Sequence, residues 1–228
     1  LGLDYHKVDH KEGLATYFRE FLRIEMNTKK PERKNYKNKS DYERDSIEWF
    51  TNPLRGWCNR NLKPDGSPYD IYKDGLKIYT TVNSKMQDYA ENAVRDHLKN
   101  TLQKQFDYLE KDKENAPFSS ELTPEQVNTI MTNSMKWSER YRVLYRVRKM
   151  PYDDVVKNFN TPTEMNVFSW HGNVDTVMTP MDSMRYYKHF LQSGFMAMDP
   201  HSGYVKAYVG GIDYHHFQYD HVTKAQRQ

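Results

Sequence analysis

Apolar residues return every three or four positions in several stretches of the chain. This spacing predicts helices over residues 11–26, 84–110 and 181–191, each with one apolar face. In the two later stretches the apolar face is built from Met and aromatic residues, which we interpret as core rather than as a cofactor site. Polar and charged residues fill the remaining positions, so the opposite faces are expected to meet water.

Shorter helical patterns fill the regions between the long ones. Residues 41–50 predict a helix that Ser40 would cap, with Ile47 and Phe50 as its apolar anchors. The sequence Thr-Pro-Glu-Gln at 123–126 is typical of a capped helix start, with Pro at the first helical position. The helices that follow are predicted over 124–135, 138–147 and 152–158.

Runs of Val, Thr, Met and aromatic residues predict strands, most of them paired in hairpins. Residues 75–81 predict a single strand. Residues 199–203, Asp-Pro-His-Ser-Gly, have turn chemistry at nearly every position, and the pair Gly210-Gly211 ends the strand beyond them. The two predicted hairpins pair 164–170 with 174–179 and 195–198 with 204–209.

Helices followed by a late cluster of strands indicate an α+β fold, because strands and helices do not alternate regularly. We expect the two hairpins to join in one antiparallel sheet edge, covered by the helices of 84–110 and 181–191. If the remaining strands of that sheet lie outside this chain, an edge of buried-type residues is left unpaired. Such an edge predicts marginal stability or self-association.

Composition and charge narrow the classes of function. The net charge of +3 is too small to indicate nucleic-acid binding, and the basic run 29–39 is typical of a solvated linker. An independent nucleic-acid-binding domain that uses this run is therefore the weakest alternative. No run approaches the roughly 18 apolar residues of a membrane-spanning helix. The single cysteine, Cys58, excludes an internal disulfide and is interpreted as a buried small hydrophobe.

Two groups of histidines raise the question of a metal site. The later group consists of His215, His216 and His221 with Asp213 and Asp220. Adjacent histidines in a strand point to opposite faces, so the pattern favours a solvated loop over a metal centre. His6 and His10 would align on a helix, but Gly13 and the flanking charges favour a frayed terminus. We therefore predict no metal ligand and no cofactor.

The predicted helix 138–147 is basic, with aromatic residues among its cations. Arg140, Arg142, Arg146, Arg148 and Lys149 alternate with Tyr141, Leu144 and Tyr145. A charged helix face in water is the favoured interpretation. Contact with acidic lipid or with anionic glycan is the alternative.

Three stretches resemble one protein family. Residues 13–20, Gly-Leu-Ala-Thr-Tyr-Phe-Arg-Glu, resemble the segment that follows the glycosyltransferase domain in the bifunctional class A penicillin-binding proteins. Residues 75–87 are similar to the start of the transpeptidase domain of that family. Residues 195–217, followed by Arg227-Gln228, look like the opening of its sheet. The three stretches occur in family order and together span nearly the whole chain.

The catalytic motifs that the resemblance implies are not in this sequence. A transpeptidase of the family needs Ser-x-x-Lys and Lys-Thr-Gly, but no serine from Ser40 to Ser202 has Lys three positions on, and Lys-Thr-Gly is absent. The chain also lacks the Glu-Asp pair of the glycosyltransferase half. We therefore predict no catalytic residue and expect a fragment that ends before the nucleophile, so any enzyme activity belongs to the full-length parent.

The resemblance implies a division into three parts. Residues 1–74 would be a helical inter-domain linker, residues 75–180 the helix-rich start of the transpeptidase domain with an insertion near 101–170, and residues 181–228 the first helix and hairpin of its core. The implied function is a non-catalytic scaffold within a peptidoglycan synthase, on the periplasmic side of the inner membrane, whose parent is anchored by an N-terminal membrane helix not present here.

The expected partners follow from the same resemblance. They are the rest of the parent chain and, through it, the peptidoglycan precursors. An envelope regulator protein is a further candidate, while nucleic acid is not expected. The alternative function is a non-catalytic interaction module of the envelope, in which 101–170 docks a partner protein.

Overall fold

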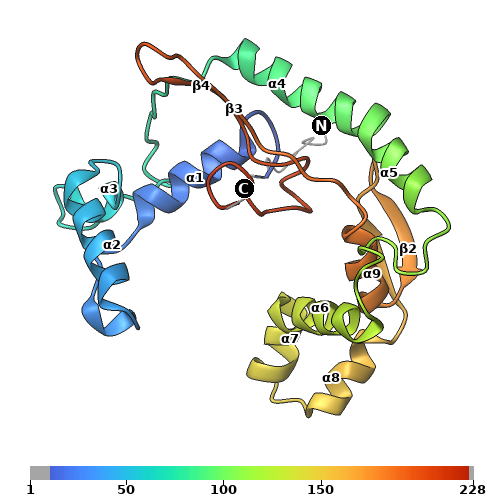
Figure 1. The fold of residues 1–228 in the computed structure, drawn as a ribbon. Helices are drawn as coiled ribbons and strands as arrows, with labels where there is room; N and C mark the ends of the chain where they lie inside the picture. Colours follow the sequence, from blue (N-terminus) through green and yellow to red (C-terminus); the bar gives the residue numbers. More distant parts are fainter. Residues whose placement is uncertain (1–10, 226–228) are drawn as a thin grey trace, which may run out of the picture. The chain divides into compact units, whose positions relative to one another are not determined.

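The computed structural model describes residues 11–225, which fall into two compact units (Figure 1). The first unit is formed by residues up to 91 together with those from 194 onward, and the second by residues 92–193. Each unit contains helices and one antiparallel hairpin, so the α+β prediction is confirmed. None of the helices within residues 11–225 has the length and apolar character needed to cross a bilayer.

The first unit contains four helical segments, the beginning of a fifth helix and one hairpin. Helix α1 begins at Thr16 rather than near residue 11, because Ala15 before it has a left-handed backbone with φ of 55°. The elements are α1 (Thr16–Asn27), the 3₁₀ turn η1 (Arg33–Asn35), α2 (Lys39–Thr51), α3 (Trp57–Arg60), the start of α4 (Ser84–His97), β3 (Phe195–Met198) and β4 (Val205–Val209).

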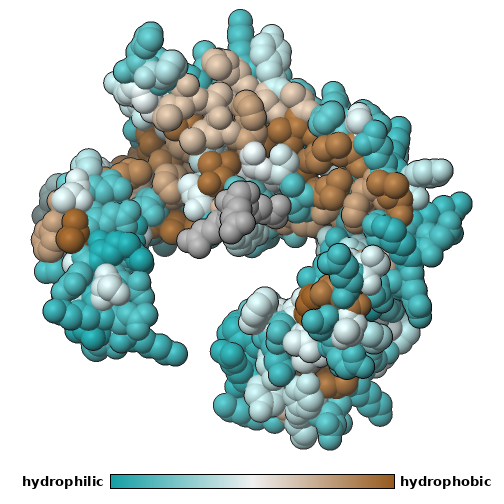
Figure 2. All heavy atoms as spheres, in the orientation of Figure 1, coloured by the Kyte–Doolittle hydropathy of each residue, from teal (hydrophilic) through white to brown (hydrophobic). Residues whose placement is uncertain are grey.

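Helix α2 buries a different residue from those that we predicted. Ile47 and Phe50 are 64% and 69% exposed, whereas Trp49 is only 5% exposed. The Trp49 ring lies so close to Gly56 that a Cβ there would fall 2.0 Å from it. The cap was also misplaced: Asn38 stands at the N-cap position, and Ser40 lies inside the helix. The rest of the α2 surface is hydrophilic (Figure 2).

The hairpin β3–β4 confirms the predicted pairing of 195–198 with 204–209, with the second strand starting one residue later. Phe195 pairs with Val209 and Met198 with Val205. In the loop, the Asp199 carboxylate accepts hydrogen bonds from the His201 amide and the Ser202 hydroxyl, at 2.9 and 2.8 Å. These bonds hold the pKa of the Asp199 carboxyl below its ordinary value.

The prediction of a strand over 75–81 is wrong. This segment has no regular secondary structure, although its end runs beside β4. The Thr81 hydroxyl donates to the Val205 carbonyl at 2.8 Å, and the Asn83 amide donates to the Lys206 carbonyl at 2.9 Å. A side chain and one backbone group thus replace the regular ladder that a strand requires.

The second unit begins within the long helix that was predicted over 84–110. That helix is continuous, but it has a π-helical stretch at its middle. A capping box at Thr123 and Gln126 starts α6, as predicted. The elements are the rest of α4, the π-helix η2 (Leu98–Leu102), α5 (Gln103–Glu110), α6 (Pro124–Trp137), α7 (Glu139–Tyr141), the π-helix η3 (Arg142–Val147), α8 (Tyr152–Phe159), β1 (Thr163–Val167), β2 (Val174–Met178) and α9 (Pro180–Tyr187).

The buried face of the long helix differs from the predicted apolar stripe. Met86, Tyr89 and Leu109 are exposed, whereas Gln87 and Gln103 are almost completely buried. The core of the second unit comes instead from α6 to α8 with support from α9. It is formed by Met135, Tyr141, Leu144, Val155 and Phe159, with Met181 and Met184 packed against it.

The hairpin β1–β2 is present as predicted, but its first strand ends at Val167 rather than at residue 170, and the pairs run from Thr163 with Met178 to Val167 with Val174. It does not join β3–β4, however, because each hairpin forms a separate two-stranded sheet, and the prediction of one shared sheet is wrong. Side chains of α9 take the backbone groups that follow β1. The Tyr187 hydroxyl accepts from the Phe168 amide at 3.2 Å, and the Tyr186 hydroxyl donates to the Phe168 carbonyl at 2.7 Å.

Candidate functional site

The ring of Tyr17 on α1 lies directly against the glycine pair after β4. A Cβ built at Gly210 would fall 2.7 Å from Tyr17 Cδ1, and one at Gly211 would fall 2.3 Å from Tyr17 Oη. Real side chains do not approach so closely, so both positions need glycine for this contact. The Tyr17 hydroxyl donates a hydrogen bond to the Phe217 carbonyl. The glycine pair follows the end of β4, as predicted, and it also leaves the space that the Tyr17 ring of α1 occupies.

Other aromatic rings extend this contact along α1 and β4. The rings of Tyr17 and Tyr214 meet edge to face with centroids 5.0 Å apart. Those of Phe18 and Phe21 lie 5.7 and 6.4 Å from the ring of Tyr208. Aromatic pairs at such distances each contribute about 0.5–1.5 kcal/mol beyond their buried area. The apolar face of α1 is thus held on the hairpin by specific ring contacts.

The first turns of α4 are attached to the same place by Gln87. Its side-chain Nε2 donates to the Tyr208 carbonyl and to Glu91 Oε1, both at 2.8 Å, and its Oε1 accepts from the Tyr208 amide at 2.7 Å. Glu91 Oε1 also accepts from the Ala15 amide at 2.8 Å. One chain of hydrogen bonds therefore connects β4, α4 and the start of α1.

Tyr208 is fixed from its other end by a buried carboxylate. Its hydroxyl donates to Asp220 Oδ2, while Asp220 Oδ1 accepts from the Val222 amide at 2.9 Å. Burial, and next the bond to Asp220, raise the pKa of Tyr208 above its ordinary value. Burial also raises the pKa of Tyr17. Both phenols stay protonated near neutral pH, so they act as structural donors rather than as acids or bases.

These contacts define one site, which we call the junction: α1, the first two turns of α4, β3–β4 and the loop 210–223. Each of the three stretches that carry the family resemblance contributes to it, through Tyr17, Gln87 and Tyr208 respectively. Along the chain, Gln87 lies 70 positions after Tyr17 and 121 positions before Tyr208. The junction is therefore the place where the resembling segments are brought together.

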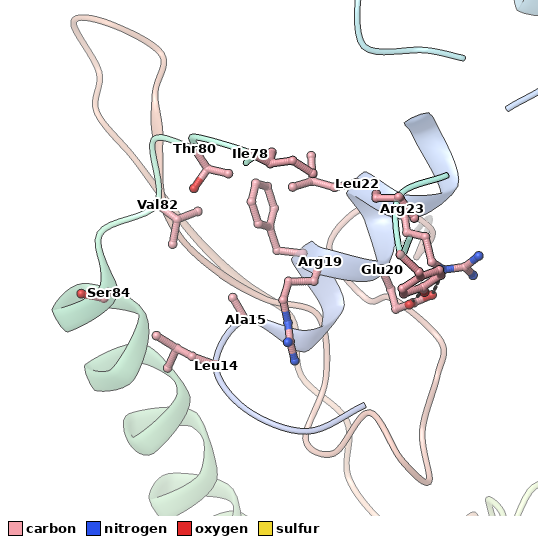
Figure 3. A pocket seen from close by; sticks show the side chains of 13 residues that line it. Leu14, Ala15, Arg19, Glu20, Leu22, Arg23, Ile78, Thr80, Val82 and Ser84 are labelled. Atoms are coloured by element: carbon pink, nitrogen blue, oxygen red, sulfur yellow. Dashed lines mark hydrogen bonds and ion pairs between the residues drawn. The ribbon is translucent and has the colours of Figure 1, made fainter. Parts of the chain in front are cut away.

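A cavity of about 400 Å³ lies beside the junction, between α1 and the segment 71–84 (Figure 3). Leu14, Leu22, Ile78 and Val82 point toward it, so its interior is largely apolar. Glu20, which is buried, forms an ion pair with Arg23 at 2.8 Å near its rim. The carboxylate is thus neutralised by its neighbour, and the cavity offers apolar surface rather than groups arranged for bond making or breaking.

The histidines near the chain end do not form a metal centre in the part of the chain described. Residues 11–225 contain no group of three potential ligands suited to a metal. His216 Nδ1 lies 3.0 Å from Asp213 Oδ1, and the Asp220 carboxylate accepts a hydrogen bond from the Tyr208 hydroxyl. His6 and His10 lie outside the described residues, as do Arg227 and Gln228. Cys58 is buried, as predicted, and burial raises the pKa of its thiol.

Sequence reasoning missed the polar residues on which the junction depends. Gln87, Glu20 and Asp220 are buried, yet each is a polar residue whose type and neighbours in the sequence do not indicate burial. The glycine pair did carry a signal, since adjacent glycines after a strand also indicate close approach of another segment.

Comparison with known proteins gives these features a context. Residues 113–191 match the family model of the penicillin-binding protein middle domain. Over 179 residues the chain is 24% identical to penicillin-binding protein 1A of Rickettsia typhi, covering 73% of this chain and 23% of that protein. The chain is therefore similar to penicillin-binding proteins, both in this domain and over most of its length. It is also 25% identical over 174 residues to penicillin-binding protein 1A of Rickettsia prowazekii, covering 71% of this chain and 22% of the relative. No solved structure matches the chain significantly.

The match to the family model changes how the second unit of this chain is understood. We interpreted 101–170 as an insertion without assigned chemistry, but most of that stretch corresponds to a domain that has its own family model. The chain spans somewhat under a quarter of the length of the curated relatives that it matches, 22–23%.

Proposed function

We propose that this chain is the non-catalytic linker and N-terminal scaffold of a bifunctional peptidoglycan synthase of the penicillin-binding protein family. The junction carries this proposal, because it ties the segment that follows the glycosyltransferase domain in the family to the segment that opens the transpeptidase sheet. Its interior polar groups are all engaged in hydrogen bonds with one another. A site of this kind holds the connected segments in fixed positions relative to one another and carries out no chemistry.

In the full-length parent, glycosyltransferase and transpeptidase domains would act on lipid-linked precursors and stem peptides on the periplasmic side of the inner membrane. The nucleophile of Ser-x-x-Lys would come from the parent beyond the hairpin. On β3, Phe195, Met196 and Met198 are exposed apolar residues. We propose that further strands of the parent cover them, which makes the rest of the parent chain the first partner of this part.

Two measurements test the proposal. Fluorescent penicillin should label the parent covalently and leave the 228-residue chain unlabelled. A covalent label on any residue of this chain would contradict the proposal that it is a non-catalytic scaffold. In the parent, Gly211→Leu should displace Tyr17 and lower cross-linking while glycan polymerisation continues. Tyr204→Ala, an exposed change on the same hairpin, is the matched control. Unchanged cross-linking in the Gly211→Leu parent would show that the junction positions nothing.

The second candidate function is protein docking by the second unit. The observation that favours it is that α6 to α8 form a separate hydrophobic core, which contains no residue of the junction. A pull-down of envelope proteins with the parent and with a parent lacking 113–191 separates the two functions. Loss of a specific partner together with normal cross-linking supports docking, whereas loss of cross-linking alone supports the scaffold.

A further inference from the structure

The second unit displays a run of cations that its own fold leaves uncovered. We call residues 136–149 the basic segment. Apart from Ser138, Tyr141, Val143 and Leu144, every residue in it is exposed. Its basic residues are Lys136, Arg140, Arg142, Arg146, Arg148 and Lys149, and Glu139 is its single acidic residue.

Internal pairing accounts for only part of this charge. Arg142 forms an ion pair with Glu139, and Arg140 Nη1 donates to Asn158 Oδ1 at 3.1 Å. Within residues 11–225, no ion pair engages Arg146, Arg148 or Lys149. The acidic residues that follow, Asp153 and Asp154, lie in the first turn of α8, where the helix dipole favours a negative charge. The end of the basic segment therefore keeps an unbalanced positive charge.

The backbone of the basic segment is unusual at the same place. Residues 142–147 are π-helical, a rare conformation that is frequent at functional sites. Hydrogen bonds from the Arg148 amide to the Val143 carbonyl, at 2.9 Å, and from the Met150 amide to the Leu144 carbonyl, at 3.1 Å, close the helix. Lys149 then has a φ of 57°, which glycine adopts without strain. A cation thus occupies a position where local stability favours glycine.

Exposed apolar side chains accompany these cations. Trp137 is 84% exposed and Val147 is 61% exposed, and Tyr145 stacks on Tyr141 while leaving part of its ring in solvent. The surrounding surface of α6 to α8 is mainly hydrophilic (Figure 2). None of the three is needed for the core, which is filled by Met135, Tyr141 and Leu144 from the same stretch.

We propose that the basic segment binds the surface of an anionic phospholipid bilayer, with Trp137 and Val147 entering the headgroup region. Arginine and lysine side chains gain from an anionic surface, and tryptophan prefers the boundary between headgroups and acyl chains. A purely polyanionic ligand such as nucleic acid or an anionic glycan explains the cations but gives no role to an exposed valine and a nearly bare tryptophan. The combination is that of an interfacial amphipathic surface.

The test is sedimentation of the 228-residue chain with vesicles of phosphatidylglycerol and phosphatidylcholine, compared with phosphatidylcholine alone. Binding is expected only to the anionic vesicles and should weaken as salt is raised. The triple variant Arg146→Gln, Arg148→Gln, Lys149→Gln should bind about a hundredfold more weakly. Lys29→Gln, Lys30→Gln, Lys37→Gln removes the same charge from the basic run 29–39 and should bind as the unaltered chain does.

A second readout separates insertion from simple charge attraction. Vesicles with brominated acyl chains should quench the fluorescence of the bound chain, and Trp137→Phe should lose most of this quenching while its circular dichroism is unchanged. The proposal is overturned by absence of binding to anionic vesicles, or by equal loss in the two triple variants. It is also overturned if heparin binds as tightly as vesicles do and lipid binding leaves Trp137 unquenched, since the segment would then be a polyanion site.

Discussion

The side-chain amide of Gln87 forms with the peptide of Tyr208 the pair of hydrogen bonds that a neighbouring strand would form, at 2.8 and 2.7 Å. Gln103 acts in the same way in the second unit, where its amide bonds the His189 carbonyl at 2.8 Å and the Leu191 amide at 3.0 Å. Each glutamine supplies a backbone-like partner from a helix. Both are buried because these bonds replace the water that they would lose.

Replacing Gln87 should therefore destabilise the first unit. Gln87→Ala leaves the amide and the carbonyl of Tyr208 buried without partners, and we expect a loss of about 1–3 kcal/mol in the free energy of unfolding. Urea denaturation measures this loss. Gln105→Ala, an exposed change on the same long helix, should be nearly neutral. Equal stability of the two variants would mean that the Gln87 bonds do not form.

The contact between Tyr17 and the glycine pair predicts a coupled effect. Gly211→Ala places a methyl group 2.3 Å from Tyr17 Oη, so the ring must move, at a cost of about 1–3 kcal/mol. In a Tyr17→Ala background the same change meets no ring and should cost much less. A double-mutant cycle of unfolding free energies measures this coupling. Additive effects would contradict the contact.

The left-handed backbone of Ala15 predicts a stabilising substitution. Ala15→Gly should raise the free energy of unfolding by up to about 1 kcal/mol, because glycine adopts a φ of 55° without the Cβ penalty. Ala90→Gly, inside α4, should lower it by a similar amount. Thermal unfolding of the two variants should shift in opposite directions, and a common direction would argue against the geometry of Ala15.

The raised pKa values of Tyr17 and Tyr208 predict sensitivity to alkali. The folded state holds these phenolic protons more tightly than the unfolded chain, whose tyrosines titrate near pH ~10. The stability that they contribute is complete below that pH and is lost as the pH rises beyond it. Tyr208→Phe should make this decline shallower. Tyr79→Phe, at an exposed position, should leave the slope as it is.

Local signals predicted their elements well. The capping box of Thr123 and the loop of 199–203 each depend on groups within a few residues, and both are present as predicted. The sequence could not show that Trp49, rather than Ile47 or Phe50, is the buried residue of α2. The space that its ring fills exists because Gly56, beyond the end of α2, has no side chain. Gln87 was beyond prediction for the same reason, since its partner lies 121 residues away.

The extended segment 75–81 shows that a local preference for β structure does not by itself predict a strand. Its residues favour β structure, and its end does lie beside β4, yet side chains take the hydrogen bonds that a ladder would need. Propensity describes what a segment can form, and pairing depends on which groups reach the neighbouring strand first. From the sequence, the candidate site could be recognised only as three stretches that resemble the family. That these stretches contact one another through Tyr17, Gln87 and Tyr208 could be seen only in the structure.

The two outer edges of the hairpin are unequal. Thr81, Asn83 and Gln87 already occupy the edge of β4, whereas no backbone hydrogen bond among residues 11–225 reaches the outer edge of β3. Of the two outer edges of β3–β4, we therefore expect the β3 edge to be the one at which a second copy of the chain would pair. Two copies paired in this way would leave no free edge of this hairpin, among the described residues, for a third copy. Aggregation through this sheet would stop at a symmetrical pair instead of growing into a fibre.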